Sequence, residues 1–299
     1  MYHEQAHSGS SPDFWEENWE ASRFEDSVRF SALDPLRPLF EAYLEPDSVM
    51  LEGGCGMGNY ISYYAGRGYN VIGLDFAAKA LKTLHLRQPQ LKLACGDVAK
   101  MPFADETFDV YYSGGVVEHF EGGADESLSE ARRVLKRDGV LLISVPYYSP
   151  LRKMLARSRK KEWRIVDRSQ TDPRPVIDGK QFFQYAYTQR EFTEMLSSAG
   201  LRVVKTQGYA VLWGLYDIPL LNPGGKSEFA ANTRQVEKPE VVEIDIEPLV
   251  RDQKVSLLKR LVVSEDASVP LLGLGVEFLR WATANMMMYV CRRADQFDA

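Results

Sequence analysis

Cysteine, histidine and long apolar runs are scarce in this 299-residue chain, and each scarcity excludes a class of protein. The three cysteines, Cys55, Cys95 and Cys291, are odd in number and widely separated, so we expect reduced thiols and no disulfide framework. Four histidines and no C-x-x-C pair leave little material for a structural zinc site. No stretch reaches the roughly 18 uncharged apolar residues that a membrane-spanning helix needs.

A surplus of positive charge is also missing. The net charge of −6 argues against a protein that coats nucleic acid electrostatically. The first residues lack a basic region followed by an apolar run, so we expect no secretory signal and a cytoplasmic location. Hydrophobic residues make up 45% and charged residues 26% of the chain, which is ordinary for a globular domain with a sizeable core.

Strand and helix patterns alternate in the first half of the chain. Apolar runs at 48–53, 69–75, 91–97, 108–114 and 140–146 predict buried strands, and the segments between them predict helices. The last of these helices is expected over 124–139, with Gly139 ending it. Continuous apolar strands separated by helices imply a parallel sheet covered on both faces, and right-handed crossovers make it a doubly wound α/β fold.

The pattern changes after Pro146. Thr188 and Glu191 form a capping box for a helix that Gly200 ends, and a strand follows that helix. A hydrophobic helix near the C-terminus, for which burial against the sheet is expected, precedes a last strand at 286–293. We expect one domain with appendages: a helical cap over 1–45, a core over 46–146, a lid insertion over 147–187, and a C-terminal part of the core sheet over 188–299 with an irregular insertion at about 214–270.

The stretch VMLEGGCGMGNY, residues 49–60, holds the most informative motif. Gly54, Gly56 and Gly58 lie on the turn after the first strand, where ligands bind in such sheets, and glycine lets a ligand approach the main chain. A dinucleotide fingerprint would need glycine or alanine at Asn59, and Glu52 would repel a pyrophosphate. A carboxylate there suits a cationic ligand such as S-adenosylmethionine. A glycine-rich connection without a ligand is the alternative.

The motif E-x-G-x-G-x-G from Glu52 to Gly58 resembles the first motif of the class I S-adenosylmethionine-dependent methyltransferases. The resemblance extends to about Pro146 and resumes from Thr188. It implies a Rossmann-like, seven-stranded sheet, mostly parallel with an antiparallel last strand, and release of S-adenosylhomocysteine as product. The cofactor-binding residues that it implies are Glu52, Gly54, Cys55, Gly56, Gly58, Asp75, Phe76, Asp97, Val98 and Gly114.

The same resemblance assigns roles to several of these residues. Asp75 matches the acid that binds both ribose hydroxyls, although a helix N-cap is an alternative role, and Phe76 would pack on the adenine face. Asp97 would accept a hydrogen bond from the adenine amino group, while the main-chain N–H of Val98 reaches a ring nitrogen. The turn that contains Gly114 would line the methionyl end.

Methyl transfer is an in-line displacement that depends mainly on positioning. A hydroxyl acceptor also needs a base, and Glu118 and His119 are the best-placed titratable pair. His119 is a candidate base with a pKa near the working pH, and packing beneath the loop is its alternative role. Some methyltransferases hold a metal with E-x-x-E-H, but Gly115 stands at the first glutamate here, so no metal is expected.

Aromatic and basic residues mark the expected acceptor side. The candidate substrate-binding residues are Trp15, Trp19, Tyr147, Tyr148, Phe183 and Tyr185, which either wall an apolar pocket or pack the lid on the core. Seven bases over 152–164 form a solvated helix face or bind an anionic partner, whether a substrate, a carrier domain or a membrane surface. Nucleic acid is disfavoured because no recognised binding module accompanies them. For the helix over 271–281, contact with lipid or with a second subunit is the alternative to burial against the sheet.

The sequence therefore predicts a methyltransferase that acts on an oxygen or nitrogen atom of a small molecule, with an anionic, carrier-linked or lipid-linked acceptor among the options. A nicotinamide-dependent oxidoreductase and a non-catalytic S-adenosylmethionine-binding protein are the alternatives. The identity of the acceptor and the oligomeric state are left open.

Overall fold

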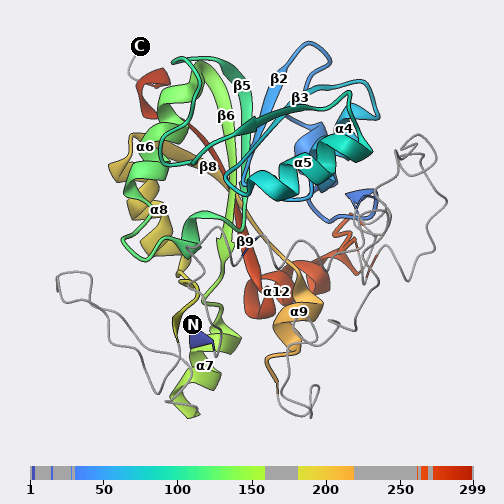
Figure 1. Cartoon of the computed structure of the whole chain (residues 1–299). Helices are drawn as coiled ribbons and strands as arrows, with labels where there is room; N and C mark the ends of the chain where they lie inside the picture. Colours follow the sequence, from blue (N-terminus) through green and yellow to red (C-terminus); the bar gives the residue numbers. More distant parts are fainter. Residues whose placement is uncertain are drawn as a thin grey trace.

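A seven-stranded sheet with helices on both faces forms the centre of the computed structural model (Figure 1). The structure describes residues 2–3, 15, 28, 31–158, 181–218, 261, 264–268 and 272–297. The strand order is β4-β3-β2-β5-β6-β9-β8. The strands are β2 (Val49–Gly53), β3 (Asn70–Asp75), β4 (Lys92–Cys95), β5 (Phe108–Gly114), β6 (Leu135–Pro146), β8 (Leu201–Tyr209) and β9 (Met286–Arg293).

The strand directions confirm the predicted doubly wound, Rossmann-like sheet. Strands β2 to β6 pair in parallel, whereas β9 runs antiparallel to both β6 and β8. The chain passes from β2 outward to β3 and β4 and then returns to place β5 on the other side of β2. Strand order therefore reverses between β2 and β5, and the crevice beyond their carboxyl ends is the expected ligand site.

Two hydrophobic clusters cover the two faces of the sheet. Alternate strand residues point to opposite sides, so Met50 belongs to one cluster and Leu51 to the other. Helices α3 (Arg37–Glu41), α4 (Asn59–Ala65) and α5 (Ala78–Arg87) pack in the first cluster. Helices α6 (Asp125–Val134) and α8 (Gln189–Ser198) pack in the second. The capping box of α8 is confirmed, since Thr188 Oγ1 accepts from Glu191 N and the Glu191 carboxylate accepts from Thr188 N.

Helix α6 is shorter than predicted, and the prediction that it runs to Gly139 is wrong. The helix ends at Val134, and Leu135 already pairs with Phe108 at the start of β6. A Cβ at Gly139 would lie 3.0 Å from the main-chain oxygen of Asp109. Gly139 is therefore explained by the close approach of β6 to β5. It does not end a helix, because residues 135–146 already form β6.

The segments that flank the core lie at the ligand edge of the sheet. Strand β1 (Tyr2–His3) pairs antiparallel with β7 (Gln181–Phe182), which joins the N-terminus to the insertion after β6. Helix α7 (Pro150–Ser158) follows β6 below its carboxyl end (Figure 1). Much of both flanking segments lies outside the described residues, so the predicted domain boundaries stay predictions.

The structure corrects one surface expectation and limits another. Helix α12 (Gly273–Thr283) buries Val276 but leaves most of its large apolar side chains exposed, among them Phe278 at 61% and Trp281 at 57%. Of the seven bases over 152–164, Arg152 is buried and bonded within the protein, whereas Lys153 and Arg157 are exposed. Residues 159–164 lie outside the described part of the chain. Among the described helices, none has the length and hydropathy to cross a bilayer.

Arg152 joins α7 to two distant parts of the chain. Its Nε donates to Asp217 Oδ2 at 2.6 Å, and one terminal nitrogen donates to the main-chain oxygens of Tyr147 at 3.0 Å and Asn285 at 2.9 Å. Its other terminal nitrogen donates to the side-chain oxygen of Asn285. This buried guanidinium fixes α7 against the loop between α12 and β9.

Replacing Arg152 by methionine should lower the free energy of unfolding by about 3 kcal/mol or more, because it leaves buried carbonyl oxygens and Asp217 without their partner. Denaturant unfolding measures the change. The neighbouring Lys153 is exposed, and Lys153→Met should change the free energy of unfolding by less than about 0.5 kcal/mol. Equal stability of the two variants would contradict the structural role of Arg152.

Candidate functional site

The glycine turn after β2 has a left-handed backbone at three positions. Gly54, Gly56 and Gly58 have φ angles of 74°, 50° and 73°. The main-chain N–H groups of Gly54 and Cys55 both donate to the carbonyl of Leu74, at 2.8 Å and 3.0 Å, which attaches the turn to the end of β3. Gly58 is the N-cap residue of α4. The motif thus builds a curved, bare main chain at the carboxyl edge of the sheet.

Packing also requires two of these glycines. A Cβ at Gly54 would overlap Cγ2 of Val116, a residue of the loop after β5. A Cβ at Gly58 would lie 2.5 Å from Leu84 Cδ2 on α5. The turn after β2 therefore needs glycine for two reasons, its left-handed backbone and its close contact with neighbouring elements. Only the left-handed backbone was apparent in the sequence.

Glu52 lies buried beneath this turn, with 5% of its surface exposed. Its Oε2 accepts a hydrogen bond of 3.0 Å from Ile61 N, in the first turn of α4, so it also caps that helix. Burial, assisted by the charge of Asp75, raises the pKa of Glu52 to about 8. A bound cation would offset the cost of burying this charge, which makes the site suited to a positively charged ligand.

Asp75 closes the other side of the turn. Its Oδ2 accepts from Gly56 N at 2.7 Å, and its Oδ1 accepts from Ala77 N at 2.8 Å. Burial raises the pKa of Asp75 above its ordinary value. Ala77, not Asp75, is the N-cap residue of α5. Each carboxylate oxygen keeps accepting capacity for a further donor such as a hydroxyl group.

The remaining cofactor-binding candidates lie along the same edge. Gly96 N donates to the carbonyl of Asp75 at 2.9 Å, which brings the exposed Asp97 and the buried Val98 next to the end of β3. Phe76 is half-buried. Cys55 packs inward, since its Sγ would lie 2.8 Å from a Cβ at Gly73, so only its main chain faces the turn. Gly114 ends β5 beside the turn.

A buried carboxyl group with one unpaired oxygen lies beyond β5, and its other oxygen, Glu118 Oε1, lies 3.9 Å from Nε2 of His119. Glu118, in the short 3-10 helix η1 (Val117–His119), is 2% exposed, and its Oε2 has no hydrogen-bond partner. Its Oε1 lies 3.5 Å from the position of a Cβ on Gly115, directly after β5. Burial raises the pKa of Glu118 to about 8. An unsatisfied buried carboxyl at a sheet's ligand edge is a candidate for proton transfer or cation binding.

His119 is held in a neutral form. Its Nδ1 lies 2.8 Å from the carbonyl oxygen of Phe183 and donates to it. The rings of Trp15 and Phe183 meet the imidazole edge-on at 4.8 Å and 4.9 Å. Burial lowers the pKa of His119 to about 4, against the opposing effect of the Phe183 hydrogen bond. The expectation of a pKa near the working pH is wrong, because aromatic packing removes the water that would stabilise the imidazolium.

Polar groups that the sequence did not single out form hydrogen bonds between distant elements. Tyr60 OH donates to Asp34 Oδ2 at 2.6 Å, and Tyr209 OH donates to Ser144 Oγ at 2.9 Å. Burial raises the pKa of Tyr209, and the charges of Asp34 and Glu118 raise it further. No local motif marks these residues, since β8, β6, α4 and the N-terminal segment meet only in the fold.

The structure brings some, but not all, of the predicted substrate-binding aromatics to this place. Tyr185 donates its N–H to the carbonyl of Glu118 at 2.9 Å and its hydroxyl to the carbonyl of Glu121 at 2.9 Å. Trp15 and Phe183 flank His119, as described above. Tyr147 and Tyr148 bond instead to the chain around Tyr187 and Asn285. Trp19 lies outside the described residues.

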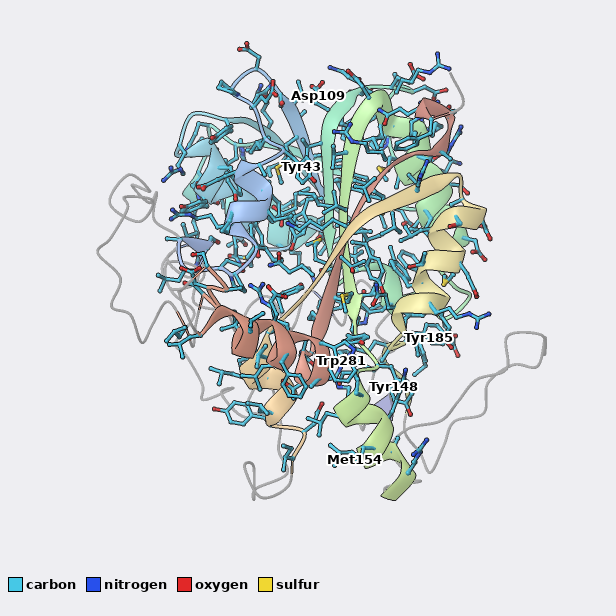
Figure 2. All side chains as sticks on the ribbon, turned by 180° about the vertical axis from the view of Figure 1, so that it is seen from behind. Tyr43, Asp109, Tyr148, Met154, Tyr185 and Trp281 are labelled. Atoms are coloured by element: carbon cyan, nitrogen blue, oxygen red, sulfur yellow. The ribbon has the colours of Figure 1, made fainter. Side chains whose placement is uncertain are left out.

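Figure 2 places this aromatic group in the molecule. Tyr148 and Tyr185 lie at one end of the molecule, and Asp109, at the start of β5, lies at the other.

Among the described residues, no three or more His, Cys, Asp or Glu side chains are grouped closely enough to hold a metal ion.

Part of the chain is similar to known methyltransferases. Residues 51–143 match the family model described as a methyltransferase domain. The chain is 29% identical over 159 residues to a probable S-adenosylmethionine-dependent methyltransferase of Mycolicibacterium smegmatis, covering 53% of this chain and 54% of that protein. It is 34% identical over 111 residues to a demethylmenaquinone methyltransferase of Renibacterium salmoninarum, covering 36% and 46%.

The match extends over only part of these proteins. The chain spans about half the length of the first curated relatives it matches, 50% and 54%. Among solved structures, an S-adenosylmethionine-dependent methyltransferase from Methanosarcina mazei aligns with a TM-score of 0.46 at 20% identity, covering 57% of this chain and 88% of that one. The fold assignment rests on the strand order and directions given above.

Proposed function

This chain belongs to the class I S-adenosylmethionine-dependent methyltransferases, and on that premise we propose that it methylates an oxygen or nitrogen atom of a small-molecule acceptor. The observation that carries the proposal is the buried Glu52 beneath a left-handed glycine turn, at the point where strand order reverses. A buried carboxyl there fits a donor that carries an ammonium and a sulfonium. It does not fit a diphosphate.

The described residues fit the groups of that donor. Glu52 would face its ammonium, and the main chain of Gly54, Gly56 and Gly114 would line the methionyl end. Asp75 would accept from the ribose hydroxyls. The chain at 97–98 and the ring of Phe76 would contact the adenine. The donor supplies a methyl group on a positively charged sulfur, so the protein's tasks are to position the acceptor and to remove its proton.

Glu118 is the residue that we propose for proton removal. A carboxylate whose pKa lies near 8 holds an accepted proton well at neutral pH, whereas an imidazole whose pKa lies near 4 does not. Moreover, Nδ1 of His119 is already committed to Phe183. We assign His119, with Trp15, to the wall that excludes water from Glu118.

The polar group around Tyr209 would position the acceptor. The carbonyl of Ser144 accepts from Gly115 N at 3.0 Å, which brings Ser144 and its partner Tyr209 toward Glu118. Their hydroxyls would offer donors and acceptors for a hydroxyl or an amine. Of the alternative functions, a nicotinamide-dependent oxidoreductase is disfavoured by Asn59 and by the burial of Glu52 beneath the turn. A non-catalytic S-adenosylmethionine-binding protein is disfavoured by the buried Glu118, which a binding role alone leaves unexplained.

Calorimetric titration tests the donor assignment. The chain should bind S-adenosylmethionine and S-adenosylhomocysteine and should not bind NAD. Glu52→Gln should weaken binding of both adenosyl ligands by about tenfold or more, because a hydrogen bond to a charged group is worth about 1.5–3 kcal/mol. The amide oxygen of the variant can still accept from Ile61 N, so helix α4 keeps its cap.

The exposed Glu45 offers a matched control, and Glu45→Gln should leave both affinities unchanged. Absence of heat with either adenosyl ligand on folded protein, or preference for NAD, would overturn the assignment. Formation of S-adenosylhomocysteine with an acceptor then separates an enzyme from a binding protein.

A further inference from the structure

Helix α12 has its apolar side facing outward. Leu274, Phe278 and Trp281 recur at helical spacing on one side and are 87%, 61% and 57% exposed. Arg280 and Thr283 lie on the other side and are 7% and 8% exposed. A surface helix of a globular protein normally shows the opposite arrangement, with its apolar stripe against the core.

Specific contacts fix α12 in this orientation. A terminal nitrogen of Arg280 donates to the main-chain oxygen of Glu265 at 2.7 Å, and its Nε lies 3.6 Å from Glu265 Oε2. Gly208 and Gly214 permit close approach, since a Cβ at Gly208 would lie 2.7 Å from the Arg280 carbonyl and one at Gly214 would overlap that of Thr283. The helix therefore cannot roll to bury its aromatic side without breaking a buried ion pair.

Two neighbouring helices extend the exposed apolar side. Helix α12 contacts both α7 and α9 (Val211–Leu215), and the three lie together at one end of the molecule (Figure 1). We define the docking face by the exposed side chains that these helices and the residue after α9 contribute: Met154, Trp213, Tyr216, Leu274, Phe278 and Trp281. Within the docking face the rings of Trp213 and Tyr216 contact each other, as do those of Phe278 and Trp281. Large exposed apolar side chains gathered on neighbouring helices in this way indicate an interaction site.

The docking face lies at the same end of the molecule as the candidate site. Met154 and Trp281 lie at the same end of the molecule as Tyr148 and Tyr185, and Asp109, at the amino end of β5, lies at the other end (Figure 2). Tyr147 N donates to the carbonyl of Asn285, directly after α12, which joins the carboxyl end of β6 to the docking face. A surface bound to this face would therefore lie next to the ligand edge of the sheet.

Two exposed basic side chains lie beside the docking face in the part of the chain that the structure describes. Lys153 and Arg157, on α7, are exposed. Among the described acids nearby, Asp217 pairs with Arg152, whereas Glu265 and Glu277 both pair with Arg280. A two-fold dimer through this face would bring the same basic side chains of two copies together. An anionic surface is instead complementary to them.

The composition of the face favours lipid over protein. Tryptophan and tyrosine carry an apolar ring with a polar tip, and they are enriched where a protein enters the boundary between headgroups and acyl chains. An outward apolar stripe flanked by lysine and arginine is the pattern of helices that lie in the plane of a membrane surface. We propose that the docking face binds an anionic lipid surface and that, given the proposed function, the methyl acceptor is a molecule held in or at that surface.

Vesicle flotation with the full chain tests this proposal without any methyl donor. The protein should bind vesicles of phosphatidylcholine with about one-third phosphatidylglycerol, and bind pure phosphatidylcholine vesicles more weakly. The triple variant Leu274→Ser, Phe278→Ser, Trp281→Ser should lower the bound fraction by about tenfold or more. The double variant Lys153→Glu, Arg157→Glu should lower binding to the anionic vesicles in particular.

A second triple variant provides the matched control. Leu86, Val204 and Phe297 are 52%, 44% and 46% exposed and are not part of α7, α9 or α12, so replacing all three by serine should leave vesicle binding unchanged. Equal loss in both triple variants, or no binding of the unmodified protein at low salt, would overturn the proposal. So would a dimer in light scattering that only the α12 variant dissociates, because the face would then belong to a second copy. None of these three results depends on methyl transfer, so the two proposals fail separately.

Discussion

Glu118→Gln should lower turnover about a hundredfold and abolish a rise of rate with pH. The side chain is buried at the ligand edge with one oxygen lacking a partner, and its raised pKa of about 8 suits proton acceptance. A base works in its deprotonated form, so kcat/KM of the unmodified enzyme should rise as pH passes through about 8 and then level off. The glutamine variant should show no such rise. Release of S-adenosylhomocysteine, followed with an acceptor across this pH range, measures both effects.

His119→Gln is the informative comparison. If His119 only excludes water from Glu118, the His119→Gln variant should keep the rise of rate with pH. Its packing against Trp15 and Phe183 would nevertheless be disturbed. Glu121 is exposed nearby, and Glu121→Gln should behave like the unmodified enzyme. A pH rise that survives in Glu118→Gln and disappears in His119→Gln would transfer the role of base to the imidazole.

The same variant makes a prediction that needs no acceptor. Because the pKa of Glu118 in the folded protein lies above its ordinary value of 4.5, the folded state binds an extra proton between about pH 4.5 and 8. The free energy of unfolding therefore falls with rising pH over this window, and Glu118→Gln removes that part of the fall. Above pH 8 the variant should melt about 3 °C or more above the unmodified protein, and below pH 4.5 the two should converge. Thermal unfolding at several pH values measures this, and equal melting at high pH would contradict the burial of a charge at Glu118.

Gly54→Ala should weaken S-adenosylmethionine binding by about tenfold or more. Position 54 has a φ of 74°, which costs a residue with a Cβ about 1–2 kcal/mol, and the added methyl group overlaps Val116. Both effects displace the turn whose main chain would contact the donor. Calorimetric titration with S-adenosylmethionine and S-adenosylhomocysteine measures the loss.

Three further variants separate the causes. Val116→Ala in the Gly54→Ala background removes the overlap but not the backbone strain, so it should restore part of the affinity. Gly68 has a φ of 88° with open space around it, so Gly68→Ala should reduce stability without affecting binding. Gly122 has neither constraint, and Gly122→Ala should be neutral. Unchanged binding in Gly54→Ala would show that the donor does not depend on this turn.

Elements that are specified by short stretches of sequence have nearly the same bounds in the structure as in the prediction. Strands β5 and β9 occupy the predicted residues, because an apolar run specifies a buried strand wherever the sheet places it. The capping box of α8 involves only Thr188 and Glu191, three residues apart. The boundary between α6 and β6 was missed because it depends on pairing of Leu135 with Phe108, a residue 27 positions away.

The candidate site divides in the same way. Glycines with a positive φ and an acid beside them can be recognised within seven residues, so the turn and Glu52 were identified from the motif alone. The polar group of Asp34, Tyr60, Ser144 and Tyr209 joins four separate parts of the chain, and nothing near any one of them marks it. The proposal of Glu118 instead of His119 as the base likewise depends on the positions of Trp15 and Phe183.

The sequence by itself determined the sheet, the left-handed turn and the cationic donor that a carboxylate beside this turn selects, because each follows from residues that are neighbours along the chain. Tertiary structure alone decided which carboxyl is left unsatisfied, why Arg152 is internal, and which side of α12 faces outward. Those properties depend on the loss of water around a side chain, and the groups that displace the water come from distant parts of the sequence.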